Sequence, residues 1–320
     1  MSDKDVTEVL RADAAGVERA AQILESGGLV AVPTETVYGL AARADSAEAV
    51  AKIYAAKGRP DFNPLIVHVR DGKQAEGYAE FNDEARRLIS SEWPGPLTLV
   101  LPIEDGAPIA GAVTANLPTI ALRCPAHPVM QALLDRVDFP LAAPSANRSG
   151  FISPTTAAHV AASLDGRIDL ILDGGPTAKG VESTILAIRA DGSWQELRPG
   201  PVDVEALHER LCGTAMPRSK SSNGIEAPGQ LASHYAPEKP VRLNAEKIEP
   251  KEFGIGFGDG NWDCNLSSGG DLNEAAARLY DCLHRGAASS KARIAIAPIP
   301  DDGIGRAIND RLRRAATPAD

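Results

Sequence analysis

The chain has 320 residues, of which 43% are hydrophobic and 24% are charged, and its formal net charge is −10. This composition is ordinary for a globular protein and excludes a largely disordered chain. The length exceeds what one hydrophobic core usually supports, so two domains are expected. The acidic charge argues against an extended nucleic-acid-binding surface, because such surfaces need clustered Lys and Arg.

The N-terminal segment and the cysteines together predict a cytoplasmic protein. The opening MSDKDVTEVL lacks a basic stretch followed by an apolar one, so no signal peptide is predicted. No apolar run approaches the ~20 residues of a membrane span. The four cysteines, Cys124, Cys212, Cys264 and Cys282, are far apart and form no C-x-x-C pair. Reduced thiols are therefore expected, with neither a disulfide framework nor a zinc site.

Short aliphatic runs alternate with helical patterns over the first part of the chain. Asp13 and Ser46 are predicted to cap two helices, because their side chains can accept hydrogen bonds from free backbone N–H groups. Another helix is predicted at 82–91. A further helix is predicted at 128–136. The predicted strands are 29–32, 65–69, 97–101, 120–122, 141–142, 168–172 and 183–188. This alternation predicts an α/β fold, and the scarcity of helix between 97 and 122 predicts a mixed sheet.

A change in composition after Cys212 precedes a shorter second region. Residues 213–229 are rich in Pro, Ser, Gly and Lys, which is typical of a linker. Beyond the linker, the pattern predicts a small α/β domain with elements at 253–257, 273–285, 294–297 and 303–314. The glycine-rich stretch 254–260 does not satisfy G-x-G-x-x-G, so it is predicted to be a strand end and a turn.

Polar clusters follow several predicted strands, which is where α/β proteins place ligands. Residues 33–40 read PTETVYGL, and they can orient a small polar substrate or form a turn before a helix. Residues 57–68 read KGRPDFNPLIVH, and their two cations suit either a polyphosphate or a helix C-terminus. Residues 144–150 read PSANRSG, which suits an anion or a plain surface loop. The absence of G-x-x-x-x-G-K-[S/T] excludes a P-loop.

The order of these clusters, continued by VESTI at 181–185 and LRPG at 197–200, resembles the YrdC-like domain. The segment PGQLASHYAP at 228–237 and the small α/β tail resemble the long, two-domain form of the threonylcarbamoyl-AMP synthase family. The resemblance covers nearly the whole chain. One departure is Leu231-Ala232-Ser233, which lacks the basic residues that many members carry before HYAP.

The resemblance implies a fold, and with it a set of boundaries. Residues 12–211 would form the YrdC-like catalytic domain, a twisted mixed sheet with flanking helices. Residues 212–239 would form a linker that folds over the nucleotide as a lid and excludes water. Residues 240–320 would form a small Rossmann-like α/β C-terminal domain.

The resemblance also implies the activity of a nucleotidyltransferase. L-threonine, bicarbonate or CO2, and ATP would give L-threonylcarbamoyl-AMP, pyrophosphate and water, with Mg²⁺ screening the phosphates. A partner transferase machinery would then pass the threonylcarbamoyl group to adenosine in certain tRNAs. Direct tRNA binding is expected to be weak or absent, because the net charge is −10.

Individual residues match the family pattern position by position. Lys57 and Arg59 would stabilise charge at the reacting phosphates. Arg123 offers the two-pronged cation that a threonine carboxylate needs. The implied threonine site is Thr36, His68, Arg123, Ala143 and Ser183. The implied ATP contacts are Arg59, Asn63, Thr119, Ser145, Ser153, Arg198 and Tyr235. No protein-held metal is implied.

Two alternatives remain at the level of the sequence. A non-catalytic RNA-binding module with a YrdC-like domain would show salt-dependent tRNA binding without ATP turnover. The net charge of −10 and the full set of small-ligand motifs weigh against that reading. A different carbamoyl transfer is known for hydrogenase-maturation proteins with a YrdC-like domain. Those chains are much longer and carry zinc-finger and acylphosphatase parts that this sequence lacks.

Overall fold

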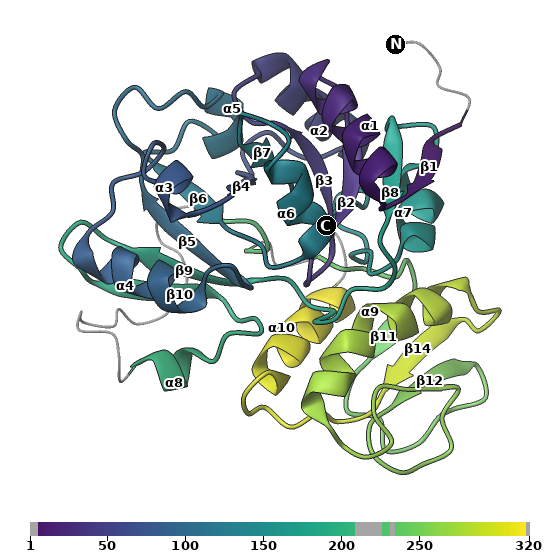
Figure 1. The fold of residues 1–320 in the computed structure, drawn as a ribbon. Coiled ribbons are helices and arrows are strands. Elements are labelled where there is room, and N and C mark those ends of the chain that lie inside the picture. The colour runs from purple at the N-terminus through teal and green to yellow at the C-terminus, as the bar shows by residue number, and fades with distance from the viewer. Residues whose placement is uncertain (1–5, 209–225, 231–233, 318–320) are drawn as a thin grey trace.

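The computed structural model of the chain describes residues 6–208, 226–230 and 234–317 (Figure 1). These residues form a larger unit, from β1 to β10, around a ten-stranded sheet, and a C-terminal unit, from β11 to α10, around a four-stranded sheet. The predicted α/β class with a mixed sheet is confirmed. Most of the predicted linker, including Cys212 and Leu231-Ala232-Ser233, lies outside the described residues.

The larger sheet has the strand order β1-β8-β2-β3-β7-β4-β6-β5-β9-β10. Pairs β1/β8, β2/β8, β4/β6 and β5/β9 are parallel, whereas β2/β3, β3/β7, β4/β7, β5/β6 and β9/β10 are antiparallel. The strands are β1 (Glu8–Arg11), β2 (Val30–Pro33), β3 (Tyr38–Arg43), β4 (Ile66–His68), β5 (Leu97–Pro102), β6 (Thr119–Arg123), β7 (Leu141–Ala142), β8 (Leu170–Asp173), β9 (Thr184–Ile188) and β10 (Trp194–Arg198).

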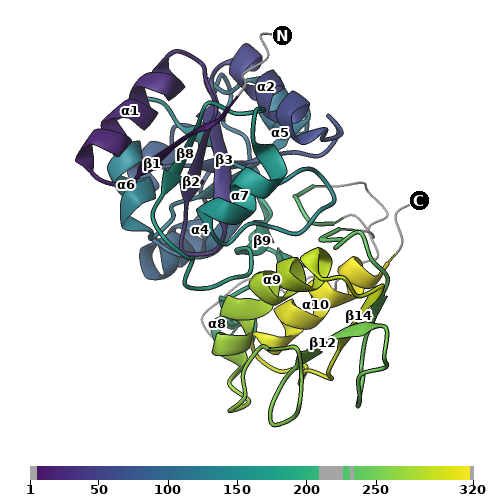
Figure 2. The same ribbon diagram turned by 90° about the vertical axis from the view of Figure 1, so that its right-hand side faces the viewer.

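Helices cover both faces of this sheet, and alternate residues of β2 pack against each layer. Val30 and Val32 belong to the hydrophobic cluster of α1 and α6, whereas Ala31 belongs to the cluster of α2 and α7. Figure 2 shows α1 and α6 on one side of the strands and α7 on the other. The helices are α1 (Ala14–Glu25), α2 (Ala47–Lys57), α3 (Gly72–Ala75), α4 (Asp83–Glu92), α5 (Gly111–Thr114), α6 (Pro128–Leu134), α7 (Ala157–Leu164) and α8 (Val204–His208).

The two predicted helix caps, Asp13 and Ser46, are confirmed, and Asn82 caps a third helix. The side chains of Asp13, Ser46 and Asn82 accept hydrogen bonds from backbone N–H groups at the starts of α1, α2 and α4. Helix α2 ends at Gly58, whose φ of 58° is a left-handed conformation that glycine adopts without strain. None of the described helices combines the length and the apolar character that a bilayer-spanning segment needs.

The C-terminal unit has a parallel sheet with strand order β11-β14-β12-β13. Its elements are β11 (Val241–Arg242), β12 (Glu252–Gly256), β13 (Cys264–Asn265), α9 (Leu272–Ala288), β14 (Arg293–Ile296) and α10 (Gly305–Ala316). Both views place α9 and α10 between this sheet and the larger unit (Figures 1 and 2). Val37, Val181 and Tyr235 belong to the same hydrophobic cluster as the two helices, so the apolar core continues across the junction.

The expectation of four reduced cysteines is wrong for one pair. Cys264 on β13 and Cys282 on α9 form a disulfide, with their Cα atoms 6.0 Å apart. That separation is within the range that a disulfide requires. The two residues are 18 positions apart in sequence and meet because α9 packs back onto the sheet. Cys124 is a buried free thiol, as expected, and Cys212 lies outside the described residues.

Candidate active site

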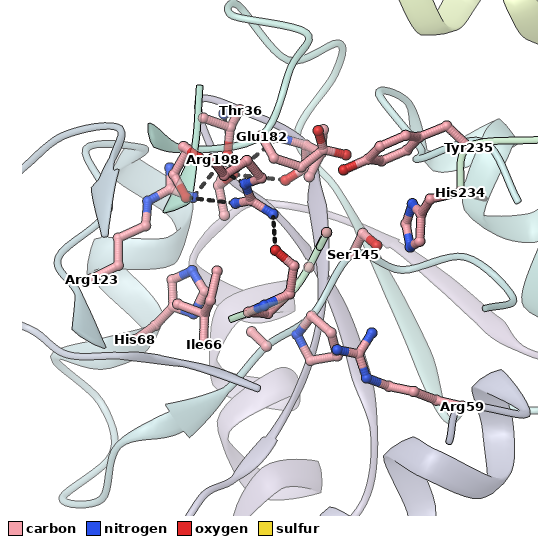
Figure 3. Close-up of a pocket in the computed structure, with 18 residues that line it drawn as sticks. Thr36, Arg59, Ile66, His68, Arg123, Ser145, Glu182, Arg198, His234 and Tyr235 are labelled. Carbon is pink, nitrogen blue, oxygen red and sulfur yellow. Dashed lines mark hydrogen bonds between the residues drawn. The ribbon is translucent and has the colours of Figure 1, made fainter. Parts of the chain in front are cut away.

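A cavity lies where loops of the larger sheet meet the segments 228–229 and 234–235 (Figure 3). Strand ends and the loops beside them supply the wall. The predicted site residues that line this cavity are Thr36, Arg59, His68, Arg123, Ala143, Ser145, Ser183, Arg198 and Tyr235.

Arg123, the last residue of β6, forms a buried cationic centre in one part of the cavity. Its Nη2 lies 2.7 Å from Oε1 of Glu35, and its Nη1 donates to Oγ1 of Thr36 over 2.9 Å. The Thr36 hydroxyl in turn lies 2.8 Å from that of Thr34 in the β2–β3 turn. Burial alone would raise the pKa of Glu35, but the charge and hydrogen bond of Arg123 hold this pKa below its usual value. The guanidinium is therefore held in place by Glu35 and Thr36.

His68, the last residue of β4, lies beside Arg123 in the sheet, because β4 and β6 pair in parallel with these two residues in register. Burial, together with the neighbouring charge of Arg123, lowers the pKa of His68 to about 3. Among the described residues, neither ring nitrogen of His68 has a hydrogen-bond partner. A buried polar group without a partner is costly, so a neutral imidazole here is suited to a ligand that supplies one.

Ser183 and Arg198 join the two strands β9 and β10 at the cavity wall. The Arg198 guanidinium donates from Nε to the Ser183 carbonyl over 3.0 Å and from Nη2 to the Ser183 hydroxyl over 3.0 Å. The Ser183 hydroxyl also lies 2.7 Å from Oγ1 of Thr98 on β5. All three side chains are buried, and these contacts hold the Ser183 hydroxyl between Thr98 and Arg198.

Arg59 and Tyr235 lie on the opposite side of the cavity from Arg123 (Figure 3). Arg59 donates from Nη2 to the Pro64 carbonyl over 2.9 Å, and burial is the main reason that its pKa falls to about 10. The group therefore remains charged near neutral pH. Tyr235 is 1% exposed and has a φ of 63°, a left-handed conformation that is uncommon for a residue other than glycine.

Lys57, which is predicted to act near the phosphates, has a buried side chain that does not line the cavity. It ends α2, and its Nζ donates to the carbonyls of Ser145 and Asn147. Burial, with the nearby charge of Arg59, lowers its pKa well below the usual value. These contacts hold the loop of residues 145–147, here called the SAN loop, which presents Ser145 to the cavity.

Three further predicted residues lie outside the cavity lining. Asn63 is buried, and neither its amide nitrogen nor its amide oxygen has a hydrogen-bond partner among the described residues. Ser153 is fully buried and donates to Oε1 of Glu182 over 2.6 Å. Thr119 begins β6 whereas Arg123 ends it, so the two lie about 13 Å apart at a rise of ~3.3 Å per residue.

Several lining residues were absent from the predicted set. Glu182 and His234 line the cavity and belong to the motifs VESTI and HYAP. Their membership in these motifs could have identified them as site residues. Burial lowers the pKa of His234 to about 3. Thr34 and Pro228 also line the cavity, at the hairpin turn and in the linker.

The carboxylates near the cavity are already paired. Glu182 contacts Arg311, and Glu35 contacts Arg123. Within the described part of the chain, no group of three or more His, Cys, Asp or Glu residues is arranged to hold a metal ion. Hard cations such as Mg²⁺ prefer unpaired carboxylates and phosphate oxygens, so these side chains do not fit a resident ion.

Two family models match the chain. The Sua5/YciO/YrdC model, described as "Telomere recombination", matches residues 22–200. The model described as "Threonylcarbamoyl-AMP synthase, C-terminal domain" matches residues 202–317.

Similar proteins span nearly the same length. The threonylcarbamoyl-AMP synthase of Bacillus subtilis is 40% identical over 98% of this chain and 96% of its own. That of Pyrococcus abyssi is 39% identical over 93% of each chain. The crystal structure of Pyrococcus abyssi Sua5 complexed with L-threonine is similar with a TM-score of 0.86 and 36% identity, covering 97% of each chain.

Proposed function

We propose a reaction for this chain, which belongs to the threonylcarbamoyl-AMP synthase family: L-threonine, bicarbonate or CO2, and ATP give L-threonylcarbamoyl-AMP, pyrophosphate and water. This nucleotidyltransferase activity serves the threonylcarbamoyladenosine (t6A) modification of tRNA. The observation that carries the proposal is the convergence of Arg59, Arg123, Ser145 and Ser183 on one cavity. Arg59, Ser145 and Ser183 come from three separate motifs, Arg123 follows a predicted strand, and only folding brings the four together.

Threonine is proposed to bind at the Arg123 end, among Thr36, His68, Ala143 and Ser183. The fixed guanidinium would receive the threonine carboxylate, and the neutral His68 would hydrogen-bond to its polar groups. Pyrococcus abyssi Sua5, which has been solved with L-threonine, supports an amino-acid site in this fold. The methyl contact of Ala143 would favour threonine over serine by only ~1–3 kcal/mol.

ATP is proposed to bind toward Arg59, Ser145, Arg198 and Tyr235. The remaining family positions, Asn63, Thr119 and Ser153, stay predictions for this nucleotide. The unpartnered amide of Asn63 supports a polar contact that a bound ligand could complete. Lys57 would act by holding the SAN loop, since its Nζ contacts the carbonyls of Ser145 and Asn147.

The chemistry proposed for this cavity needs positioning and charge more than a nucleophilic side chain. The threonine amine and bicarbonate or CO2 form a carbamate, whose oxygen attacks the α-phosphorus of ATP in line while pyrophosphate leaves. The two reactants are both anionic, so cations must offset their repulsion. Arg123 at one end and Arg59 at the other are placed to do so.

Mg²⁺ is proposed to enter bound to the ATP phosphates. The nearby carboxylates are paired with arginines, so the protein would contribute little direct coordination. The segment around Tyr235 is proposed as a lid, which is supported by the position of His234 and Tyr235 in the cavity wall. Excluding water there would protect the mixed anhydride product from hydrolysis.

The domain boundaries are likewise proposed as 12–211, 212–239 and 240–320. The two family matches, at 22–200 and 202–317, support a division into two parts. The protein is proposed to act in the cytoplasm and to release its product to a tRNA threonylcarbamoyl transferase machinery. Direct tRNA binding is proposed to be weak, given the net charge of −10.

A pyrophosphate-release assay tests the activity. With ATP and bicarbonate, release should depend on added L-threonine, and the product should have the mass of threonylcarbamoyl-AMP. Arg59→Ala should lose turnover while remaining folded. Arg136→Ala, on an exposed pair with Glu18, is the matched control and should stay active. Release that does not need threonine, or a folded wild-type chain without release, would contradict the proposal.

A further inference from the structure

Two side chains of the C-terminal unit reach the wall of the cavity. Tyr280 of α9 and Arg311 of α10 are both 0% exposed, and both contact the carboxylate of Glu182. The Tyr280 hydroxyl lies 2.9 Å from Oε1 and 2.8 Å from Oε2, and Nε of Arg311 donates to Oε2 over 3.0 Å. Ser153 donates to Oε1 over 2.6 Å. Glu182 lines the cavity, so its carboxylate links the two units at the site.

Arg311 also joins the two backbone segments that carry cavity side chains. Its Nη1 donates to the Pro199 carbonyl over 2.7 Å, and its Nη2 donates to the Glu182 carbonyl over 3.4 Å. Pro199 follows Arg198 directly, and Glu182 precedes Ser183 directly. One guanidinium from α10 therefore fixes the spacing of the segments whose side chains, Ser183 and Arg198, hydrogen-bond to each other.

The loop before Glu182 also packs closely against α9. A Cβ atom on Gly180 would lie 2.2 Å from the Ala276 carbonyl oxygen and 2.4 Å from Cα of Ala277, both on α9. Gly180 has a φ of 70°, which also favours glycine. The backbone of the loop before Glu182 thus lies directly on the backbone of α9.

Tyr235 packs against the same two residues. Its ring centroid is 5.7 Å from that of Tyr280, and Cζ of Arg311 lies 5.7 Å from the Tyr235 ring. Figure 3 shows the Tyr235 ring directed toward Glu182. The contacts of Tyr280 and Arg311 therefore reach both the fixed wall of the cavity and the segment proposed as its lid.

We propose that Arg311 and Tyr280 are positioning residues for the synthase reaction: by holding Glu182 and the Pro199 carbonyl, they set the places of Ser183, Arg198 and Tyr235 around the substrates. This inference rests on the function proposed above. It assigns the C-terminal unit a part in building the site rather than a separate activity.

The charge of Glu182 provides a readout that simple loss of stability would not change. Burial raises the pKa of Glu182, but the charges of Arg311 and Arg198 and the hydrogen bonds from Ser153 and Arg311 outweigh it, so the pKa is about 2. The other titratable groups facing this carboxylate are His234, Tyr235 and Tyr280. Without the Arg311 cation, burial would move the titration of Glu182 upward, toward the pH range of the assay.

The test uses the full-length chain with three variants and one matched control. Tyr280→Phe removes only the hydroxyl, Arg311→Lys keeps the charge without the planar fork, and Arg311→Met removes both. The control is Arg242→Met, because Arg242 makes a similar two-pronged contact, over 2.9 and 2.6 Å, with buried Glu252 in the same unit. Neither Arg242 nor Glu252 lines the cavity. Folding is checked by circular dichroism and thermal unfolding.

We expect Tyr280→Phe to lose roughly tenfold in kcat/KM and Arg311→Met to lose at least about 100-fold, with Arg311→Lys between wild type and Arg311→Met. The acid limb of the kcat/KM profile should move to higher pH in Arg311→Met and stay in place in Arg242→Met. The inference is overturned if folded Tyr280→Phe and Arg311→Lys match wild type. It is also overturned if Arg242→Met loses as much activity as Arg311→Met. A wild-type chain without threonine-dependent pyrophosphate release would refute the proposed function instead.

Discussion

Arg123→Met should strongly destabilise the folded state. In the wild type, Nη2 of Arg123 lies 2.7 Å from Oε1 of Glu35, and their side chains are 4% and 11% exposed. At an effective dielectric constant of about 20, opposite charges at this distance attract by ~6 kcal/mol, before the cost of removing them from water. Removing one partner strands the other charge in the interior, which typically costs about 3–5 kcal/mol. We expect a loss of that size near neutral pH.

The pH dependence of this loss identifies its cause. In the wild type, the folded-state pKa of Glu35 is below its usual value, so the pair stabilises the fold above that value and stops doing so as the pH falls. In Arg123→Met, burial acts without the cation and raises the folded-state pKa of Glu35. The folded variant then takes up a proton before the unfolded chain does. The difference in stability between wild type and variant should therefore be largest near pH 7 and shrink toward about pH 4.

Urea unfolding followed by circular dichroism, at about pH 7 and about pH 4.5, measures this difference. Arg136→Met is the matched control, because Arg136 and Glu18 form a pair over 2.8 Å with side chains 54% and 50% exposed. An exposed pair contributes ~0–1 kcal/mol. The double variant Arg123→Met/Glu35→Gln should recover part of the loss. A cost for Arg123→Met no greater than that for Arg136→Met, or one that is independent of pH, would refute the reasoning.

His68 should stay neutral from about pH 5 to 8, because its pKa is about 3; NMR titration of its ring protons should show no transition there, and a midpoint near the usual value would contradict its burial. Reducing the Cys264–Cys282 disulfide should lower the unfolding free energy by roughly 3 kcal/mol, as expected for a loop of 18 residues. Dithiothreitol should then lower the melting temperature of the wild type but not of Cys282→Ser. Lys57→Met should lower both turnover and thermal stability, since Nζ holds the Ser145 carbonyl; a fully stable but inactive variant would instead favour direct contact with phosphate.

Local chemistry was enough to predict most helices. Asp13, Ser46 and Asn82 each combine a side chain that can cap a helix with a following run of good helix formers, and each caps a helix in the structure. The strand Tyr38–Arg43 was not predicted. All but its last residue are buried, so it lacks the alternation of apolar and polar residues that reveals a half-exposed strand. The segment was interpreted as a substrate loop or a turn before a helix.

The motif residues of the site could be predicted from the sequence, but the residues that hold them in place could not. Arg123 stands out because it follows a short aliphatic run, and Ser183 stands out because it belongs to a motif in a familiar order. Their alignment depends on contacts over long sequence separations. Arg311 meets Glu182 across 129 positions, and Cys264 meets Cys282 because a helix returns to a strand. The local sequence does not reveal such contacts, because they depend on how the helices and sheets pack against one another.

The overall acidity of the chain and the cationic character of its cavity are compatible because they concern different parts of the molecule. Among the described residues, Glu182 is the acidic residue that lines the cavity, and it forms an ion pair with Arg311. The wall also presents Arg59, Arg123 and Arg198. Removing these charged groups from water is unfavourable, and carbonyl, hydroxyl and carboxylate partners offset part of that free energy. Two anionic reactants brought between these cations would repel each other less than in water. The net charge of a chain therefore bears on whether an extended surface can bind a ligand such as tRNA. What a cavity can bind depends instead on its individual arginines and their buried partners.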